Sequence, residues 1–540
     1  MPYKKMKLIY APSGKRIIPY PPVGINVLKM ELNKENINNI ELIDLEIILW
    51  NLHLKRRDIL IFNKDTTPLD ALKKNNFRNQ SGINKYYKEL NKILNIKEGD
   101  EIGISIMGYE QLFSTLLIIK IGLEKRCRVI LGGQYINENS LKEILSLFSN
   151  PNLTAVVGDG SRAIIYWKKN NVNLTNNCFR LIKNNIISGK IEENSKFLPI
   201  PNFENTKWDY YLNYSNELYK NHNIKAAHLF INDKHCPYKC NFCRVSHGNK
   251  IKIHPIQEII KVFIQLVQSE VKNINLIINE LNISYKFLKL FLEELNSFLP
   301  KDHNISWFTY LRGDKIHKKD FEKLKQVGCK LVRWGVESGS QRILNKMNKD
   351  LSIKIIKENL RLSSDAGIFN HVNFMVGYPG ETDDDIEKTI FFISEMKDYI
   401  HSVRINPFYV PPGTYLAENP EKYGIKLIKF KSGYWDFKLL EGETADTIKI
   451  KNNINKMCKQ LSKQNIGYVG VDPFFLINIL SKFDKRDDAL KAMKEDYAFL
   501  WEKYSSEKMK SLIGKYYVKD NLDNVILKRG KNYNLSICYD

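Results

Sequence analysis

Three cysteines lie within eight residues near the middle of the chain, and their spacing is the clearest sign of chemistry in the sequence. They are Cys236, Cys240 and Cys243, in the segment HCPYKCNFC at 235–243. Thiolates spaced C-x3-C-x2-C can bind three irons of a [4Fe–4S] cubane, for which full cysteine ligation would need a fourth cysteine. The missing ligand would leave one iron open, as a catalytic metal centre requires.

Two other interpretations of this spacing stay open from the cysteines alone. One is a zinc knuckle with His235 or His247 as its fourth ligand. The other is a thioredoxin-like redox pair, Cys240 and Cys243, which would leave Cys236 without a role. The remaining five of the eight cysteines are scattered singly, unlike the evenly spaced framework of a secreted disulfide protein.

Alternating strand and helix patterns surround the cysteine segment and must position it. Strands are predicted at 226–231, 274–279, 305–311, 331–336, 371–376 and 403–407, and helices at 256–269, 285–298, 320–327, 353–366 and 383–396. Six such units predict a partial (βα)6 barrel with its chemistry at the carboxyl ends of the strands. The cysteines follow the first of these strands directly.

The N-terminal part alternates in the same way and predicts a parallel sheet wrapped by helices. Strands are expected at 7–11, 40–45, 101–107, 128–132 and 154–158, and helices at 109–123 and 139–148. Ligands of such sheets bind beyond the carboxyl ends of the strands. We therefore predict an α/β chain with a Rossmann-like domain at 1–170, a linker at 171–223, the barrel at 224–425 and a helical C-terminal domain at 426–540, with helices at 445–461 and 488–504.

The cysteine segment and the strand ends that follow it resemble the radical SAM (S-adenosylmethionine) superfamily. Its signature is C-x3-C-x-aromatic-C after the first barrel strand, and Phe242 occupies the aromatic place. The segments WGVESGS (334–340), FMVGYPGET (374–382) and RINPF (404–408) resemble its fourth, fifth and sixth strands. The resemblance implies a [4Fe–4S] cluster whose open iron binds the amino and carboxylate groups of SAM. Reductive cleavage of SAM then gives a 5′-deoxyadenosyl radical.

The resemblance also implies SAM-binding residues at the strand ends, each with a capping or packing role as its alternative. The second strand would offer Asn279 and Glu280 to the SAM amino group, although the usual Gly-Gly-Glu is absent. Arg312 and Ser338 would bind the carboxylate, and Glu337 the ribose hydroxyls. The full set of implied SAM residues is Phe242, Asn279, Glu280, Arg312, Glu337, Ser338, Gly377, Gly380 and Asn406, the two glycines allowing the backbone to approach the adenine.

The N-terminal segments are similar to the cobalamin-binding-like domain that precedes many radical SAM domains. They include PYPPVG (19–24), the run at 105–111, and the Gly pairs near 132 and 158. The residues implied for cobalamin are Ser105, Gly132, Gly133, Gly158 and Gly160. The Asp-x-His-x-x-Gly signature is missing and Ser161 stands where the family often has Glu. A Rossmann-like module that has lost cobalamin is therefore the alternative.

Composition restricts the class of partner. The formal charge of +23 is spread along the chain, Lys greatly outnumbers Arg, and no compact basic run occurs, so we do not expect a nucleic-acid partner. No apolar stretch is long enough for a membrane span, and the cysteine usage fits a reducing cytoplasm. We expect a small-molecule or peptide substrate, and an electron donor such as flavodoxin or ferredoxin.

The expected activity is cobalamin-dependent methylation of an unactivated carbon. A cyclase or rearrangement enzyme of the same architecture is one alternative. A tRNA-modifying methylthiotransferase is another, but it would need a second cysteine set, which Cys127 and Cys178 do not make. A metal-containing nucleic-acid module is the non-enzymatic alternative, and the SAM-like strand segments argue against it.

Overall fold

The computed structural model describes residues 4–12, 20–51, 80–108, 111–169, 174–182, 185–191, 200–204, 206–219, 225–231, 236–244, 253–277, 280–314, 316–431, 434–440, 447–463, 467–468, 473–496, 518–519 and 525–526. The chain forms two compact units. The first holds residues 1–223 with 513–536, and the second holds 224–512 with 537–540. Each unit is built on one seven-stranded sheet.

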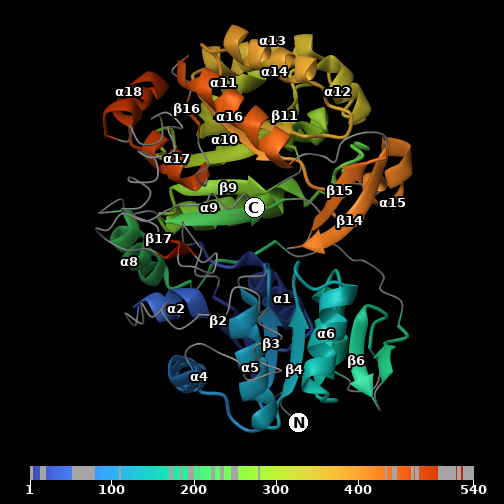
Figure 1. The fold of residues 1–540 in the computed structure, drawn as a ribbon. Helices are drawn as coiled ribbons and strands as arrows, with labels where there is room; N and C mark the ends of the chain where they lie inside the picture. The colour runs from blue at the N-terminus through green and yellow to red at the C-terminus, as the bar shows by residue number, and fades with distance from the viewer. Residues whose placement is uncertain are drawn as a thin grey trace. The chain divides into compact units, whose positions relative to one another are not determined.

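The sheet of the first unit has the order β2-β1-β3-β4-β5-β6-β7 (Figure 1). Its strands are β1 (Met6–Tyr10), β2 (Ile40–Asp44), β3 (Glu101–Ser105), β4 (Arg128–Gly132), β5 (Leu153–Val156), β6 (Cys178–Ile182) and β7 (Asn185–Ser188). The strands β1 to β5 pair in parallel, and β6 and β7 are antiparallel additions. The order 2-1-3-4-5 is that of a flavodoxin-like doubly wound sheet, whose ligand crevice lies where β1 and β3 diverge.

Helices cover both faces of this sheet because the strands are apolar on both sides. One apolar cluster joins the sheet to α4 (Gln80–Leu94), α5 (Leu112–Glu124) and α6 (Glu138–Phe148). A second cluster joins the other face to α1 (Val23–Lys34) and α7 (Ser161–Lys169). The unit also contains α2 (Leu45–Asn51), α8 (Trp208–Tyr219) and the short pair β17 (Val518–Lys519) and β18 (Val525–Ile526).

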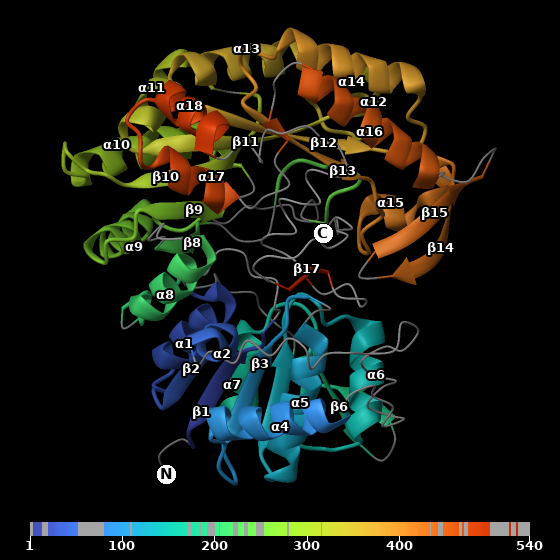
Figure 2. The same cartoon turned by 60° about the vertical axis from the view of Figure 1, so that its left-hand side comes forward.

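The second unit is a partial barrel of parallel strands in sequence order, with a short extra strand at one edge. Its strands are β8 (Ala226–Phe230), β9 (Asn273–Ile277), β10 (Ser306–Leu311), β11 (Cys329–Glu337), β12 (Phe369–Val376), β13 (Ser402–Pro407) and β16 (Gly467–Tyr468). The helices between them are α9 (Ile256–Gln268), α10 (Tyr285–Phe298), α11 (Lys318–Gln326), α12 (Gln341–Lys346), α13 (Ile353–Asp365) and α14 (Asp383–Glu395), and Figure 2 shows α13 and α14 on the outside of the strands.

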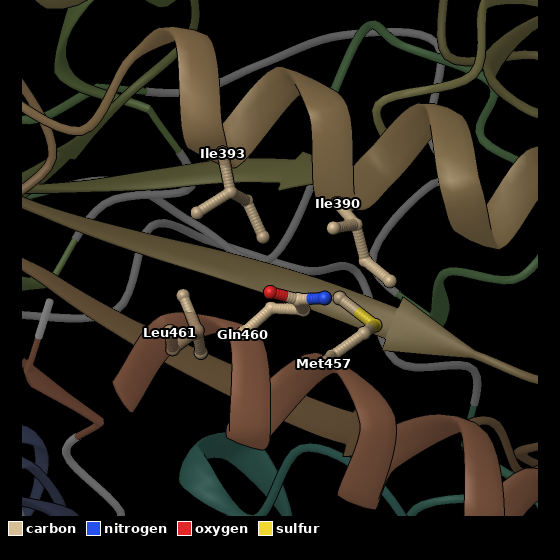
Figure 3. A pocket seen from close by; sticks show the side chains of 5 residues that line it. All are labelled: Ile390, Ile393, Met457, Gln460 and Leu461. Carbon is tan, nitrogen blue, oxygen red and sulfur yellow. The ribbon is translucent and has the colours of Figure 1, made fainter. Parts of the chain in front are cut away.

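Two groups of elements after β13 complete this unit. At the carboxyl end of the strands, α15 (Tyr415–Glu418) and the hairpin β14 (Ile425–Lys431)–β15 (Tyr434–Leu439) pack with Phe242 in one apolar cluster. The helix α16 (Thr447–Lys463) lies against α14. Figure 3 shows Ile390 and Ile393 of α14 facing Met457, Gln460 and Leu461 of α16, with no room between them for a water-sized molecule. This contact is therefore packing and not a binding site.

The helices α17 (Pro473–Leu480) and α18 (Arg486–Asp496) lie at the amino end of the barrel strands. Lys330, near the start of β11, donates to the carbonyl of Phe483, and Arg486 donates to the carbonyl of Ser364 at the end of α13. The sequence of α17, PFFLINIL, is apolar around the helix, as expected of a buried helix.

The predicted α/β class is confirmed, and its strands lie within a few residues of their predicted positions. The structure differs in two places. Part of the predicted linker, residues 178–188, extends the first sheet as an antiparallel pair. The predicted helical C-terminal region begins with the β14–β15 hairpin, and its helices α16 to α18 belong to the same compact unit as the barrel. Among the described residues, no helix is long and apolar enough to cross a membrane.

Candidate metal centre and cofactor site

The cysteine loop follows β8 and lies at the carboxyl ends of the barrel strands. Cys236 and Cys240 are buried, and Cys243 is half-buried. The Sγ atom of Cys236 lies 3.8 Å from Oε2 of Glu280, which follows β9. Burial, reinforced by the charge of Glu280, raises the pKa of Cys236 to about 12. Burial also raises the pKa of Cys240, against the opposing charges of Lys349 and Arg312. Without metal these two thiols are thus protonated near neutral pH, and metal binding would release their protons.

One short stretch, residues 346–350, holds the cysteine loop, and we call it the anchor segment. The side chain of Asn241 donates to the Lys346 carbonyl at 2.6 Å, and its backbone N–H donates to the Met347 carbonyl at 3.1 Å. The hydroxyl of Tyr378, after β12, donates to Oδ1 of Asn241 at 2.8 Å. Asn348 donates to the carbonyl of Lys239 at 2.7 Å. The loop is therefore fixed by hydrogen bonds on both sides of Cys240.

The arrangement of the ligands bears on the choice between a cluster and a single metal ion. Among the described residues, no three His, Cys, Asp or Glu side chains converge as ligands of one ion must. In a cubane each thiolate binds a different iron, so its ligands need no common point. Three cysteines on one anchored loop fit the cluster. The proposed zinc ligands His235 and His247 lie outside the described residues.

Alternating charges line the space beside the loop. The ammonium of Lys349 lies 3.5 Å from Oε1 of Glu337 and 5.7 Å from the centre of the Phe242 ring. Burial opposes its charge, but the carboxylates of Glu337 and Glu280 act in the other direction and the pKa of Lys349 is raised. Burial raises the pKa of Glu280, with Lys349 and Arg312 acting in the opposite direction. The sequence analysis did not select Lys349, which follows α12.

The backbone at Glu337 is strained. Its φ angle is +71°, a left-handed value that few residues with a side chain adopt. The register between β11 and β12 shifts between Gly335 and Glu337, which marks a bulge. A Cβ atom on Gly335 would lie 2.8 Å from Oε1 of Glu337, so the glycine leaves room for that carboxylate. Such strain is concentrated at functional sites, which agrees with the role predicted for Glu337.

Two residues that were predicted to bind the SAM carboxylate have partners within the protein. The guanidinium of Arg312 donates to the carbonyls of Lys349 and Asp350, pairs with Asp314 and lies 3.6 Å from the centre of the Tyr238 ring. Arg312 thus ties the anchor segment to the cysteine loop.

Ser338 is fully buried. Its hydroxyl lies 3.4 Å from that of Thr389 and accepts a hydrogen bond from the Ser340 amide. Ser338 therefore connects the end of β11 to α14, and it does not line the cleft described below.

The predicted adenine glycines follow β12. Gly377 has a φ of +94°, and a Cβ there would meet Cδ1 of Ile450 on α16 at 2.5 Å. Gly380 has a φ of +78°, and a Cβ would meet Nζ of Lys346 at 2.5 Å. Backbone conformation and close packing thus account for both glycines. Asn279 lies outside the described residues.

A cleft opens beside the loop, with about 380 Å³ of space for water-sized molecules. It brings together three of the predicted residues, Phe242, Glu337 and Asn406. The sequence analysis missed its other lining residues: Tyr310, Arg333, Asn373, Met375, Arg404, Pro407, Phe408, Tyr409 and Pro411. Four of these, Arg333, Asn373, Met375 and Arg404, follow the two-residue period of β11, β12 and β13, which turns every second side chain to the same face.

In the first unit, the predicted cobalamin residues follow the parallel strands. Ser105 ends β3 beside β1, at the switch point of the sheet, and is buried. Gly158 has a φ of +84°, and a Cβ there would meet nothing within 4 Å, so the loop after β5 leaves open space. Both residues lie at the carboxyl ends of parallel strands, where sheets of this kind bind their ligands.

Of the other three glycines, local packing requires Gly133 but not Gly132 or Gly160. A Cβ on Gly133 would lie 2.2 Å from the carbonyl oxygen of Ile106, so the glycine is required whether or not a ligand binds. A Cβ on Gly132 would be in ordinary contact with Val156, and one on Gly160 with Leu28, at 3.7 and 3.8 Å. Ser105 and Gly158 therefore fit the proposed group best.

Known proteins resemble parts of this chain in sequence. Residues 234–393 match the family model of the radical SAM superfamily. An uncharacterized methyltransferase of Pyrococcus horikoshii is 27% identical over 192 residues, which cover 34% of this chain and 39% of that protein. A tRNA-2-methylthio-N(6)-dimethylallyladenosine synthase of Ehrlichia canis is 30% identical over 201 residues, 35% of this chain and 44% of that protein. The chain spans less than half the length of these relatives.

Two solved structures resemble nearly the whole chain. TsrM of Kitasatospora setae, a radical SAM methyltransferase with cobalamin and a [4Fe–4S] cluster bound, aligns with a TM-score of 0.60 at 12% identity, over 92% of this chain and all of that chain. OxsB, a cobalamin-dependent radical SAM enzyme, aligns with a TM-score of 0.58 at 15% identity. The alignment covers 95% of this chain and 73% of that chain. At these identities the likeness shows the fold.

The family match covers the cysteine loop and the strands that surround it. A radical SAM domain implies a [4Fe–4S] cluster and SAM, and the three thiolates fit such a cluster. Residues 234–393 therefore form a radical SAM domain, in a chain that has the fold of solved cobalamin-dependent radical SAM enzymes.

Proposed function

We propose that this protein cleaves SAM reductively at the cysteine loop and methylates an unactivated carbon of its substrate with the help of cobalamin. The observation that carries the proposal is the anchored loop of three cysteines beside a cleft that Phe242 and Glu337 line. When bound, a [4Fe–4S] cluster supplies an electron to SAM, and cobalamin supplies a transferable methyl group. Electrons would come from a small donor such as flavodoxin or ferredoxin.

The protein's own residues bind the cluster, orient SAM and exclude water from the site. Cys236, Cys240 and Cys243 hold three irons, and the bonds of Asn241 keep the loop in place. The carboxylate of Glu337 accepts hydrogen bonds from the ribose hydroxyls of SAM, and Lys349 fixes its orientation from 3.5 Å. The apolar cluster that contains Phe242 and the β14–β15 hairpin keeps water from one side of the loop. Exclusion of water protects a carbon radical from side reactions.

Cobalamin is part of the proposal for two reasons. Two solved proteins of similar fold, TsrM and OxsB, have cobalamin bound. The first unit of this chain also has the flavodoxin-like strand order, with Ser105 at the switch point and open space at Gly158. Small residues at this edge are what a large planar cofactor with a nucleotide tail requires.

Isotope labelling of SAM tests this reaction. One SAM would donate its methyl group and leave as S-adenosylhomocysteine, and a second would be cleaved to methionine and 5′-deoxyadenosine. We expect the two adenosyl products in about equal amounts, and three deuteriums in the product when the SAM methyl group is deuterated. A cyclase or rearrangement enzyme would form 5′-deoxyadenosine without matching S-adenosylhomocysteine and without label. That outcome would refute methyl transfer and leave SAM cleavage standing.

A second candidate function, tRNA methylthiotransfer, is favoured by the names of several relatives. The cysteines of the first unit speak against it. Cys127 is buried just before β4, and Cys178 is buried at the start of β6, where its Sγ lies 3.1 Å from the hydroxyl of Thr175. Among the described residues, neither belongs to a cluster of metal ligands. Mass spectrometry of tRNA incubated with the enzyme would detect a methylthio group if this candidate were correct.

A further inference from the structure

Two side chains on neighbouring strands of the barrel carry polar atoms that the protein leaves unpaired at the cleft. Arg333 lies on β11 and Asn373 on β12, two strands labelled in Figure 2, and both residues line the cleft. The Nε atom of Arg333 and the Oδ1 atom of Asn373 are buried, and neither has a hydrogen-bond partner among the described residues. Buried polar atoms of native proteins are almost always satisfied, so each exception calls for an explanation, of which a bound ligand is one.

The strand register separates these two side chains. Asn373 pairs with Gly335, two residues beyond Arg333 on β11, so the two side chains begin about 8 Å apart. Arg333 pairs with Tyr310 of β10, and its guanidinium carbon lies 4.5 Å from the centre of the Tyr310 ring. The strands β10 and β12 lie on opposite sides of β11. A ligand that reaches both Arg333 and Asn373 therefore presents a different atom to each.

The two unpaired atoms need opposite kinds of partner. The Nε atom of arginine is always a donor, so its partner is an acceptor such as a carbonyl oxygen. The Oδ1 atom of asparagine is an acceptor, so its partner is an N–H or an O–H. A carboxylate or a phosphate supplies acceptors and would leave Oδ1 of Asn373 unsatisfied. An amide supplies an acceptor and a donor on separate atoms, and in its planar trans form the C=O and the N–H point to opposite sides.

The charge of the cleft disfavours a cationic donor. Among the described residues that line it, the cations are Arg333 and Arg404. The sole carboxylate of that lining belongs to Glu337, which pairs with Lys349. Burial, together with the charges of Arg333 and Arg404, holds the pKa of His371, the register partner of Arg333, well below its usual value. A protonated amine would meet the same repulsion, whereas an uncharged N–H would not.

We propose that Arg333 and Asn373 bind an uncharged amide of the substrate, whose carbonyl accepts from Arg333 and whose N–H donates to Asn373. A peptide, a lactam or a simple carboxamide presents this pair. Met375 follows Asn373 on the same face of β12 and lines the cleft with Phe242 of the cysteine loop. The apolar part of the substrate therefore lies along Met375, toward the loop. That the amide belongs to a substrate rests on the function proposed above, but the amide site itself does not.

The adenine ring of SAM and the carboxamide side chains of cobalamin are other sources of paired donors and acceptors. The probe is N-methylbenzamide, which joins an aromatic ring to one C=O and one N–H. In N,N-dimethylbenzamide a methyl group replaces the N–H, and benzoate is an anion without a donor. Saturation-transfer NMR with the full-length, anaerobically reconstituted protein gives the dissociation constant of each probe. Equilibrium dialysis gives the affinities for SAM and for hydroxocobalamin, which separate the cofactors from a substrate.

Two variants assign the two hydrogen bonds separately. The native protein should bind N-methylbenzamide at least about fivefold more tightly than the dimethyl compound, the fold-change of one net hydrogen bond. Asn373→Leu keeps the number and branching of the side-chain heavy atoms and should abolish this preference. Arg333→Met should weaken both amides about fivefold and keep the preference, because both retain the carbonyl. Arg361→Met is the matched control and should behave as the native protein does, because Arg361 is exposed on the outer helix α13, where it stacks on Tyr399.

Several results would overturn the proposal. The native protein could bind the two amides equally, or fail to bind N-methylbenzamide up to its solubility limit. The preference could persist in Asn373→Leu, which would make it steric. Benzoate could bind more tightly than N-methylbenzamide, which would show an anion site. Either variant could lose about fivefold in affinity for SAM or hydroxocobalamin, which would assign the residue to a cofactor. Should Asn373→Leu fail to fold, Asn373→Ala takes its place. Formation of 5′-deoxyadenosine in the same preparations reports separately on the proposed function.

Discussion

Asn241 offers a sharp test of how the cysteine loop is held. Its side chain makes two hydrogen bonds, to the Lys346 carbonyl at 2.6 Å and from the Tyr378 hydroxyl at 2.8 Å. The change Asn241→Leu removes both bonds and keeps the number and branching of the side-chain heavy atoms. After the substitution, the Tyr378 hydroxyl and the Lys346 carbonyl remain bonded to each other, because Tyr378 also donates to that carbonyl at 3.1 Å. Neither group is then left without a hydrogen-bond partner. The substitution therefore costs two net hydrogen bonds, about 1–3 kcal/mol of stabilisation of the loop.

This loss should be visible in the affinity for iron, because a metal site is stabilised by the fold that presents its ligands. A cost of about 1–3 kcal/mol corresponds to a cluster bound about 5- to 140-fold more weakly. The assay is anaerobic titration of reconstituted protein with a ferrous chelator, followed by the visible absorbance of the cluster. Asn345→Leu, on the exposed side of α12, is the matched control and should behave as the native protein does.

A double-mutant cycle separates anchoring from a general loss of stability. Tyr378→Phe alone leaves the bond from Asn241 to the Lys346 carbonyl, so its effect should be small. The two changes together remove both donors of that carbonyl, and the cluster should weaken by more than the sum of the single effects. If Asn241→Leu holds iron within twofold of the native protein, or if the two effects simply add, the anchoring argument is refuted.

Three further predictions concern single residues. Cys240→Ala should abolish 5′-deoxyadenosine formation and lower bound iron, whereas stoichiometric zinc without iron in the native protein would exclude the cluster. Glu337→Ala should keep the cluster but weaken SAM binding by about 1–3 kcal/mol in equilibrium dialysis; unchanged affinity would leave Glu337 a structural role. Burial raises the pKa of Glu381 to about 7 from 4.5, and its Oε2 accepts from the Gly377 amide. The folded state then binds more protons than the unfolded state, so its stability should fall as the pH rises from 4.5 through 7. Glu381→Gln should flatten that part of a thermal-unfolding profile, and an unchanged slope would contradict the assignment.

The sequence predicts the barrel well because each strand is a short apolar run followed by a helix pattern, as at β12 and α14. The residues 382–385 even contain a complete N-terminal capping box, Thr382 with Asp385. The strands β6 and β7 were assigned to the predicted linker because their residues have mixed polarity, and several of them are half-buried or exposed. The hairpin β14–β15 was missed although the sequence of its first strand, IKLIKFK, comes close to the two-residue alternation of a strand.

The site was only partly predictable because strand ends reveal where a residue lies and not which way its side chain turns. Glu337 and Phe242 do line the cleft, whereas Ser338, one residue after Glu337, points to Thr389. Arg312 was read as a ligand-binding cation, but its partners are backbone carbonyls from a segment 37 residues away. Such long-range pairs leave no local pattern in one sequence. Arg333 does follow a local pattern, the two-residue period of β11. It was not selected because the analysis concentrated on the family-like segment 334–340, which begins at the next residue.

The anchor segment has a consequence for how this protein can vary during evolution. The cysteine loop and Arg312 hold it mainly through the carbonyls of residues 346, 347, 349 and 350, to which Asn348 adds one side-chain bond. Substitution of most of its side chains would leave these bonds intact, whereas an inserted or deleted residue would put every carbonyl out of register. Asn348 and Asp350 adopt φ angles of +53° and +51°, which Asn, Asp and Gly tolerate best. Related sequences should therefore differ in composition here, keep the length fixed, and retain those residue types at the two positions.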